Sequence, residues 1–272
     1  MAAYPGKGPA CPSTMMHDFA RIADAGAGLG RSLGRQFWIA GAVTLAFSVL
    51  ARWIRGVSPS GALAGGVVCF VLYAGAGLGA FAALVSVFGL AWITTRLGYQ
   101  RKQKLGTAEK QEGRTASQVL ANLGVAASCA ALYAASHGKA IFLLASAAAL
   151  SEAAADTVSS ELGQACSEKA RLITTWEQVP AGTDGGVSLV GTIAGVAAAT
   201  LVSLVCVLTG LLPWKWLGTS VAAAVLGMVA DSYLGAWLER RQLVNNDSVN
   251  FLSTVVAAGA ASLLAPVLVF QT

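Results

Sequence analysis

The chain alternates long apolar runs with short polar segments, a pattern typical of helices that cross a membrane. The apolar runs cover residues 37–51, 61–95, 117–155, 187–237 and 249–270. The second run carries no charge, and as one helix it would be about 52 Å long against a hydrocarbon core of about 30 Å. Because Gly75, Gly77 and Gly79 lie in its middle, we expect two helices with a turn there.

The runs 117–155 and 187–237 are each long enough for a hairpin of two helices. Their turns are expected at 136–139 and at 212–216, where Pro213 and two tryptophans suit the membrane interface. The last run predicts one helix. The fold class is therefore all-α, a polytopic integral membrane protein of eight transmembrane helices in repeated hairpins, or of seven if 61–95 is a single tilted helix.

We expect two parts along the chain. Residues 1–35 are rich in Gly, Ala and Pro and predict a flexible or surface-lying lead segment, with a targeting peptide as the alternative. Residues 36–272 predict one transmembrane helical catalytic domain.

Composition excludes an ordinary soluble enzyme. Of the 272 residues, 56% are hydrophobic and 11% charged, and the mean hydropathy is +0.65, whereas soluble domains carry about 25% charged residues. The 31 glycines indicate helices that pack closely in lipid. The five cysteines are scattered without a C-x-x-C motif and the two histidines are isolated, so any metal would be held by carboxylates.

The net charge of +5 comes from basic residues that gather in the loops on one predicted side of the membrane, so a nucleic-acid partner is not needed to explain it. Eight helices would place segments 52–60, 96–116, 156–186 and 231–248 on one side, with twelve basic residues. The connectors on the other side contain Lys139 and Lys215 alone. This asymmetry predicts cytoplasmic long loops, and we expect a bacterial inner-membrane protein.

An internal repeat supports the hairpins. Residues 56–65 and 186–195 share six identities in ten positions, and both precede a helix that enters from the predicted cytoplasmic side. Ser58, Ser188 and Asn250 are expected to be N-caps.

Acidic residues are rare, and several stand where an apolar helix ends. At helical spacing they form two stripes: Glu152, Asp156, Ser159 and Gly163 with Glu161 at the side, and Asp231, Gly235 and Glu239. Acids at a membrane boundary are functional candidates, although an ordinary helix-end carboxylate is the alternative. Two such stripes that face one cavity could hold Mg²⁺ through oxygen ligands.

Three polar segments could bind phosphate. The glycine-rich turn 180–188 precedes a helix but lacks the Gly-Lys-Ser/Thr of a P-loop, and it could equally be a simple turn. The basic loop 96–114 could neutralise phosphates, or it could simply set the topology. The polar cluster at 245–250 is a further candidate, and its alternative role is to cap the last helix and nothing more. Together with the acids, these segments favour phosphoryl or nucleotidyl transfer to a membrane lipid.

An ordered series of motifs resembles the phytyl-phosphate kinase family, which includes plant and cyanobacterial members and the animal transmembrane protein 19. The resemblance covers about residues 40–270. Its motifs are 95–106, 113–114 with Asn122, 153–163, 171–175, 179–188, 231–235 and 245–250.

The resemblance implies a kinase that converts a prenyl monophosphate, such as phytyl- or geranylgeranyl-phosphate, to the diphosphate with a nucleoside triphosphate, CTP being favoured. Asp156, Glu161 and Asp231 would hold Mg²⁺ and triphosphate, and Lys104 and Arg171 would act with them as catalytic residues. The expected nucleotide-binding residues are Arg114, Asn122, Thr174, Thr175, Gly182, Thr183, Asp184, Gly185, Gly186, Ser188, Asn246 and Asn250. Expected partners are the prenyl-phosphate lipid, nucleotide and membrane lipid, and the oligomeric state is open, a homo-oligomer included.

Two alternatives remain. A lipid-phosphate nucleotidyltransferase is one, because Asp231-x-x-x-Gly235 is similar to elements of lipid cytidylyltransferases. A small transporter coupled to protons or cations is the other, but it predicts acids near the middle of the spans, whereas Asp156 and Asp231 lie near the predicted cytoplasmic ends.

Overall fold

The structure, a computed structural model, describes residues 37–269, with side chains up to residue 265. The expected lead segment 1–35 lies outside the described residues. The chain divides into two compact units, Met1–Val43 and Thr44–Thr272, and every site discussed below lies in the second unit.

The described chain is built from apolar helices and one small sheet. The helices are Phe37–Trp53, α2 (Pro59–Arg96), α3 (Tyr99–Leu105), α4 (Ala116–Ala135), α5 (Ala140–Cys166), α6 (Leu189–Leu208), the 3-10 helix η1 (Trp214–Trp216), α7 (Leu217–Leu234), the π-helix η2 (Gly235–Glu239) and α8 (Asn246–Val269). Within the described residues, six helices are long and apolar enough to cross a membrane, and Phe37–Trp53 is a shorter apolar helix. The predicted all-α integral membrane fold is confirmed.

Helix α2 folds back on itself at Gly77, where the backbone takes φ 77° and ψ −164°. Because the halves run in opposite directions, its end returns to the residues before its start. The indole Nε1 of Trp92 donates to the Ile54 carbonyl at 3.3 Å, and Arg96 donates to the same oxygen at 2.8 Å. One straight helix could not make these contacts, so the single tilted helix is wrong and the expected pair of helices is present.

The internal repeat has a structural basis at two helix starts. Ser58 caps α2 and Ser188 caps α6, and in each case the serine Oγ accepts from the amide of the glycine three residues on, at 3.1 Å. The third expected cap is wrong: Asn250 lies inside α8, and Asn245 instead accepts from the Ser248 amide at 3.0 Å. Helix α8 therefore begins one turn earlier than the hydropathy pattern indicates.

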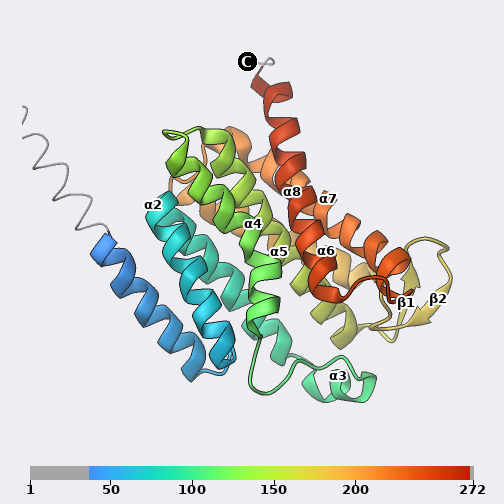
Figure 1. Ribbon diagram of the computed structural model, residues 1–272. Helices are drawn as coiled ribbons and strands as arrows, with labels where there is room; N and C mark the ends of the chain where they lie inside the picture. The colour runs from blue at the N-terminus through green and yellow to red at the C-terminus, as the bar shows by residue number, and fades with distance from the viewer. Residues whose placement is uncertain (1–36, 270–272) are drawn as a thin grey trace, which may run out of the picture. The chain divides into compact units, whose positions relative to one another are not determined.

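Helix α5 is the centre of the bundle and contacts α2, α4, α6, α7 and α8 (Figure 1). Small residues allow this close packing, as the composition predicts. A Cβ on Gly195 of α6 would lie 2.8 Å from the Ala155 carbonyl, and one on Gly75 would lie 2.7 Å from the Ala130 carbonyl. Apolar side chains such as Leu63 and Leu189 are exposed on the outside, as expected where lipid covers a bundle.

The loop between α5 and α6 forms a three-stranded antiparallel sheet that the sequence pattern did not predict. Its strands β1 (Lys169–Leu172), β2 (Gln178–Pro180) and β3 (Gly186–Val187) are arranged in the order β2-β1-β3. The strands are very short, and in β1 two buried positions alternate with exposed ones. This sheet and α3 lie at one end of the bundle, and the turn between α4 and α5 lies at the other (Figure 1).

Candidate active site

The two acidic stripes face each other where α5, α7 and α8 meet. The carboxyl groups of Asp156 and Asp231 lie close to each other, and Glu152 lies one turn before Asp156. Ser253 of α8 lies close to both Glu152 and Asp231, and its hydroxyl donates to the Asn250 carbonyl at 3.0 Å. Asp156 and Asp231 are 75 positions apart in the sequence, yet they belong to one polar cluster inside an apolar bundle.

The cluster has the chemistry of an incomplete cation site. Oδ2 of Asp231 and Oε1 of Glu152 are buried and have no hydrogen-bond partner among the described residues. Buried carboxylate oxygens without partners fit a hard cation, and Mg²⁺ is commonly held by one or two carboxylates together with substrate phosphates and water. No group of three His, Cys, Asp or Glu side chains in the described part of the chain could hold a metal by itself. Asp156 and Asp231, the carboxyl pair of this site, would therefore supply part of a coordination shell that phosphate completes, with Glu152 beside them.

Glu161 takes part in a separate contact, a buried ion pair with Lys102 of α3. Its Oε2 lies 2.5 Å from Lys102 Nζ, and its Oε1 accepts from Thr95 Oγ1 at 2.7 Å. Lys102 is 1% exposed and also donates to the carbonyls of Thr94 and Thr95. Both carboxylate oxygens are thus engaged, which favours a structural ion pair over the metal ligand that the resemblance implies.

Arg114, a predicted phosphate-binding residue, lies near the carboxyl pair. It precedes α4, and its guanidinium lies 3.5 Å from the hydroxyl of buried Thr157 and near the charge of Asp156. Its backbone is held by a parallel bridge to Val57, in which the Ser58 amide donates to the Arg114 carbonyl at 3.0 Å. The start of α2 therefore fixes where this arginine points.

Replacing Gly61 by alanine should displace Arg114. A Cβ at Gly61 would lie 2.1 Å from the Arg114 carbonyl oxygen, so the bridge must open, and we expect the activity proposed below to fall about 10- to 100-fold. The measurement is kcat/KM of the purified protein in detergent. Gly89→Ala, where a Cβ meets nothing within 4 Å, is the matched control, and equal rates for the two variants would contradict this role of the bridge.

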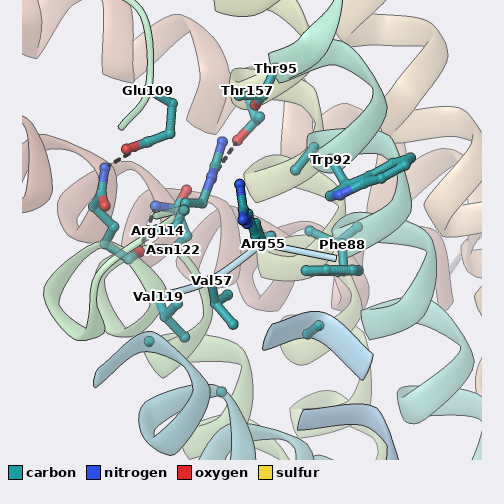
Figure 2. Close-up of a pocket in the computed structure, with 18 of the residues that line it drawn as sticks. Arg55, Val57, Phe88, Trp92, Thr95, Glu109, Arg114, Val119, Asn122 and Thr157 are labelled. Atoms are coloured by element: carbon teal, nitrogen blue, oxygen red, sulfur yellow. Dashed lines mark hydrogen bonds between the residues drawn. The ribbon is translucent and has the colours of Figure 1, made fainter. Parts of the chain in front are cut away.

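An apolar cavity of about 330 Å³ opens beside Arg114 (Figure 2). It lies between the residues before α2, both halves of α2, the loop before α4, and α4 and α5. Predicted Asn122 is buried in its wall, where its amide donates to the Gln118 carbonyl at 2.9 Å. Glu109 is the one acid among the lining residues, and its oxygens accept from Gln118 and the Lys110 amide.

The glycine-rich turn packs against η2, which begins four residues after Asp231. Gly185 has φ 73°, and a Cβ there would lie 2.5 Å from the Cβ of Ala236. Its neighbour Gly186 uses its amide inside the turn, donating to the Thr183 carbonyl at 2.8 Å. Burial raises the pKa of Asp184, and Arg240 opposes this rise. The turn therefore lies beside η2, which carries Glu239, but part of its backbone already has partners.

The other predicted residues lie outside the cavity wall. Lys104 is exposed on α3, and Arg171 is exposed on β1, where it donates to the Trp176 carbonyl at 2.9 Å. Thr174 and Thr175 lie in the turn between β1 and β2, Gly182 packs against Thr107, and Ser188 caps α6. Asn246 is exposed at the first position of α8, and the Asn250 carbonyl accepts from Ser253.

Several residues that the fold brings to the site are not among those that the sequence pattern predicts. Arg55 and Trp92 line the cavity, Thr157 contacts Arg114, Ser253 lies close to Glu152 and Asp231, and Lys102 is the buried cation of the basic loop. The signal for Arg55 was its place at the end of an apolar run, and Thr157 follows Asp156 directly. Nothing in the spacing distinguished Lys102 from its basic neighbours.

The fold and these groups define an integral membrane protein with an apolar cavity lined by arginines, one of which lies near a half-buried carboxyl pair. The chain belongs to the integral membrane protein family DUF92, whose profile matches residues 42–258. No solved structure matches the chain.

Relatives come from archaea, cyanobacteria and plants. An uncharacterized membrane protein of Methanocaldococcus jannaschii is 35% identical over 205 residues, which cover 74% of this chain and 83% of the relative. An uncharacterized membrane protein of Synechocystis is 29% identical over 72% of this chain and 77% of its own length. Protein VTE6, chloroplastic, of Arabidopsis thaliana is 28% identical over 78% of this chain and 66% of its own length. These findings agree with the family that the motifs resemble.

Proposed function

We propose that this protein is a prenyl-phosphate kinase that transfers the terminal phosphoryl group of a nucleoside triphosphate, CTP being favoured, to a membrane prenyl monophosphate such as phytyl- or geranylgeranyl-phosphate. The observation that carries the proposal is Arg114, which lines the apolar cavity and lies near the charge of Asp156. A cation at this junction can neutralise phosphate on an apolar acceptor beside the carboxyl pair. The similarity to Arabidopsis VTE6 supports a kinase-type enzyme.

The acidic residues and the arginine would have different roles, the acids in binding a cation and the arginine in binding phosphate. Asp156 and Asp231 would hold Mg²⁺, which when bound would neutralise the triphosphate and orient its oxygens. Arg114 would neutralise the acceptor phosphate, and the packed helices would exclude water that competes with the acceptor. Because the acceptor is already an anionic phosphate oxygen, this site needs positioning and charge neutralisation more than a general base. The site would face the cytoplasm, in agreement with the basic loops.

Product analysis tests the proposal. Purified protein in detergent, with Mg²⁺ and each of the four nucleoside triphosphates in turn, should convert geranylgeranyl-phosphate to the diphosphate and release one nucleoside diphosphate per turnover, fastest with CTP. Release of pyrophosphate with a nucleotidyl-lipid product would instead identify a nucleotidyltransferase, which Asp231-x-x-x-Gly235 also permits. Proton or cation flux into proteoliposomes without nucleotide, and no lipid product, would favour a transporter.

A further inference from the structure

The cavity has two chemically different parts. One part is apolar, and its wall includes Phe47, Leu84, Val87 and Phe88; the ring of Phe47 packs edge-on against Phe88 with centroids 5.3 Å apart. The other part lies at the start of α2 and carries cations. Four basic side chains line the cavity, against the single acid Glu109: Arg55, Arg96, Lys110 and Arg114.

Arg55 and Arg114 both point into the cavity (Figure 2). The described residues give neither of them a salt bridge, whereas Arg96 lies over the ring of Trp92 at 4.1 Å and donates to two carbonyls. Two guanidinium groups that face one space repel each other unless an anion lies between them. This part of the cavity therefore fits a phosphate group.

The backbone places Arg55 there at a position that normally takes glycine. Arg55 has φ 55° and follows the helix Phe37–Trp53 as its left-handed C-terminal cap, with the Gly56 amide donating to the Ala51 carbonyl at 2.9 Å. Such a conformation costs free energy for a residue other than glycine. Glycine would adopt this backbone conformation without that cost, so the guanidinium of Arg55 can be removed by a change to glycine that the backbone tolerates.

Gly65 lies in the wall of the apolar part of the cavity. It lies six residues after Pro59, about 9 Å deeper along α2, and it lines the cavity. A Cβ at Gly65 meets no protein atom within 4 Å, whereas one at Gly61 would clash with the Arg114 carbonyl. A larger side chain at position 65 would therefore enter the cavity without displacing the surrounding helices.

We infer that this cavity is the acceptor site, in which Arg55 and Arg114 bind the phosphate of a prenyl monophosphate and the apolar wall at Gly65 and Phe88 binds the isoprenoid units next to it. The inference rests on the proposed function and assigns its lipid substrate to a place separate from the carboxyl pair. Arg114 then lies between acceptor and donor phosphates, Arg55 contacts the acceptor alone, and Gly65 limits what tail can enter.

Binding without nucleotide tests the site directly. Purified wild-type protein should retain radiolabelled geranylgeranyl-phosphate, and unlabelled geranylgeraniol, phosphatidic acid or inorganic phosphate should compete at least about tenfold less well. One surplus methylene in an apolar pocket weakens binding about 10- to 200-fold, and Gly65→Leu, which adds a four-carbon side chain, should weaken retention by at least about tenfold. Gly89→Leu, on the same helix but outside the cavity wall, should bind as the wild type does.

Arg55→Gly provides a second variant that keeps the fold. Glycine adopts the positive φ at position 55 without strain, so a loss of binding would report the missing guanidinium. We expect retention to weaken about 10- to 100-fold and KM for the nucleotide to stay within about twofold. Arg55→Lys should recover part of the loss.

Failure of the inference and failure of the proposed function give different results. If the wild type makes diphosphate but Gly65→Leu and Arg55→Gly bind and react as the wild type does, the acceptor lies elsewhere. Equal competition by phosphatidic acid would overturn the assignment to a prenyl phosphate. A third outcome is that the wild type binds the prenyl phosphate, both variants lose this binding, and no nucleotide gives phosphoryl transfer. The assignment of the cavity is then supported and the kinase activity is contradicted.

Discussion

Replacing Asp231 by asparagine should lower kcat for prenyl-phosphate phosphorylation by about 100- to 1000-fold, the size of loss seen when one preorganised electrostatic group is removed from an active site. The asparagine keeps the size of the side chain, so the packing of α7 against α5 and α8 should persist. Removing one of two adjacent carboxyl groups also removes a repulsion, and Tm in detergent should stay the same or rise. Asp156→Asn should behave alike.

The pattern of kinetic constants identifies the cause. If Asp156 and Asp231 hold Mg²⁺, both variants need more Mg²⁺ for half-maximal rate, while retention of geranylgeranyl-phosphate without nucleotide stays as in the wild type. Glu177→Gln, which removes an exposed acid in the turn between β1 and β2, is the control and should leave the rate unchanged. A wild-type rate in both aspartate variants would show that the carboxyl pair does not take part in the reaction.

The meeting of Asp156 and Asp231 could be predicted because acids are conspicuous in apolar helices. A carboxylate at the end of an apolar run has few favourable surroundings, so two such stripes are expected to share one polar cluster. The turn at Gly77 was predictable for a related reason, since the helix length exceeded the membrane thickness. In both cases, the membrane interior permits few arrangements of the chain, because buried acids are costly and the hydrocarbon core has a limited thickness.

The cationic part of the site could not be predicted in the same way. Outside the apolar runs, basic residues are common, and water solvates most of them equally well. Lys102 is buried while Lys104 is exposed, and this difference depends on how α3 lies on α5. The position of Arg55 depends on the cap of the preceding helix, and the position of Arg114 depends on a bridge between segments 57 positions apart. Such contacts follow from tertiary packing, which hydropathy and spacing do not encode.

Replacing Lys102 by methionine should reduce the free energy of unfolding by about 3–5 kcal/mol. The change leaves Glu161 without its cation and two backbone carbonyls without their donor in a buried position. We expect a clear fall of Tm in detergent. Lys104→Met removes an exposed charge of the same kind two residues on and should change stability by less than about 0.5 kcal/mol. Equal Tm values for the two variants would contradict the buried ion pair.

Adding Glu161→Gln to Lys102→Met separates the two roles considered for Glu161. In an ion pair, the second change removes the uncompensated charge, so the double variant should be more stable than Lys102→Met alone, with a coupling energy of about 0.5–3 kcal/mol. The Mg²⁺ concentration for half-maximal rate of Glu161→Gln should then equal that of the wild type. A metal ligand would give the opposite result, a raised Mg²⁺ requirement without coupling to Lys102. Because Lys102 and Thr95 engage both oxygens of Glu161, we expect the first result, with Mg²⁺ held by Asp156 and Asp231.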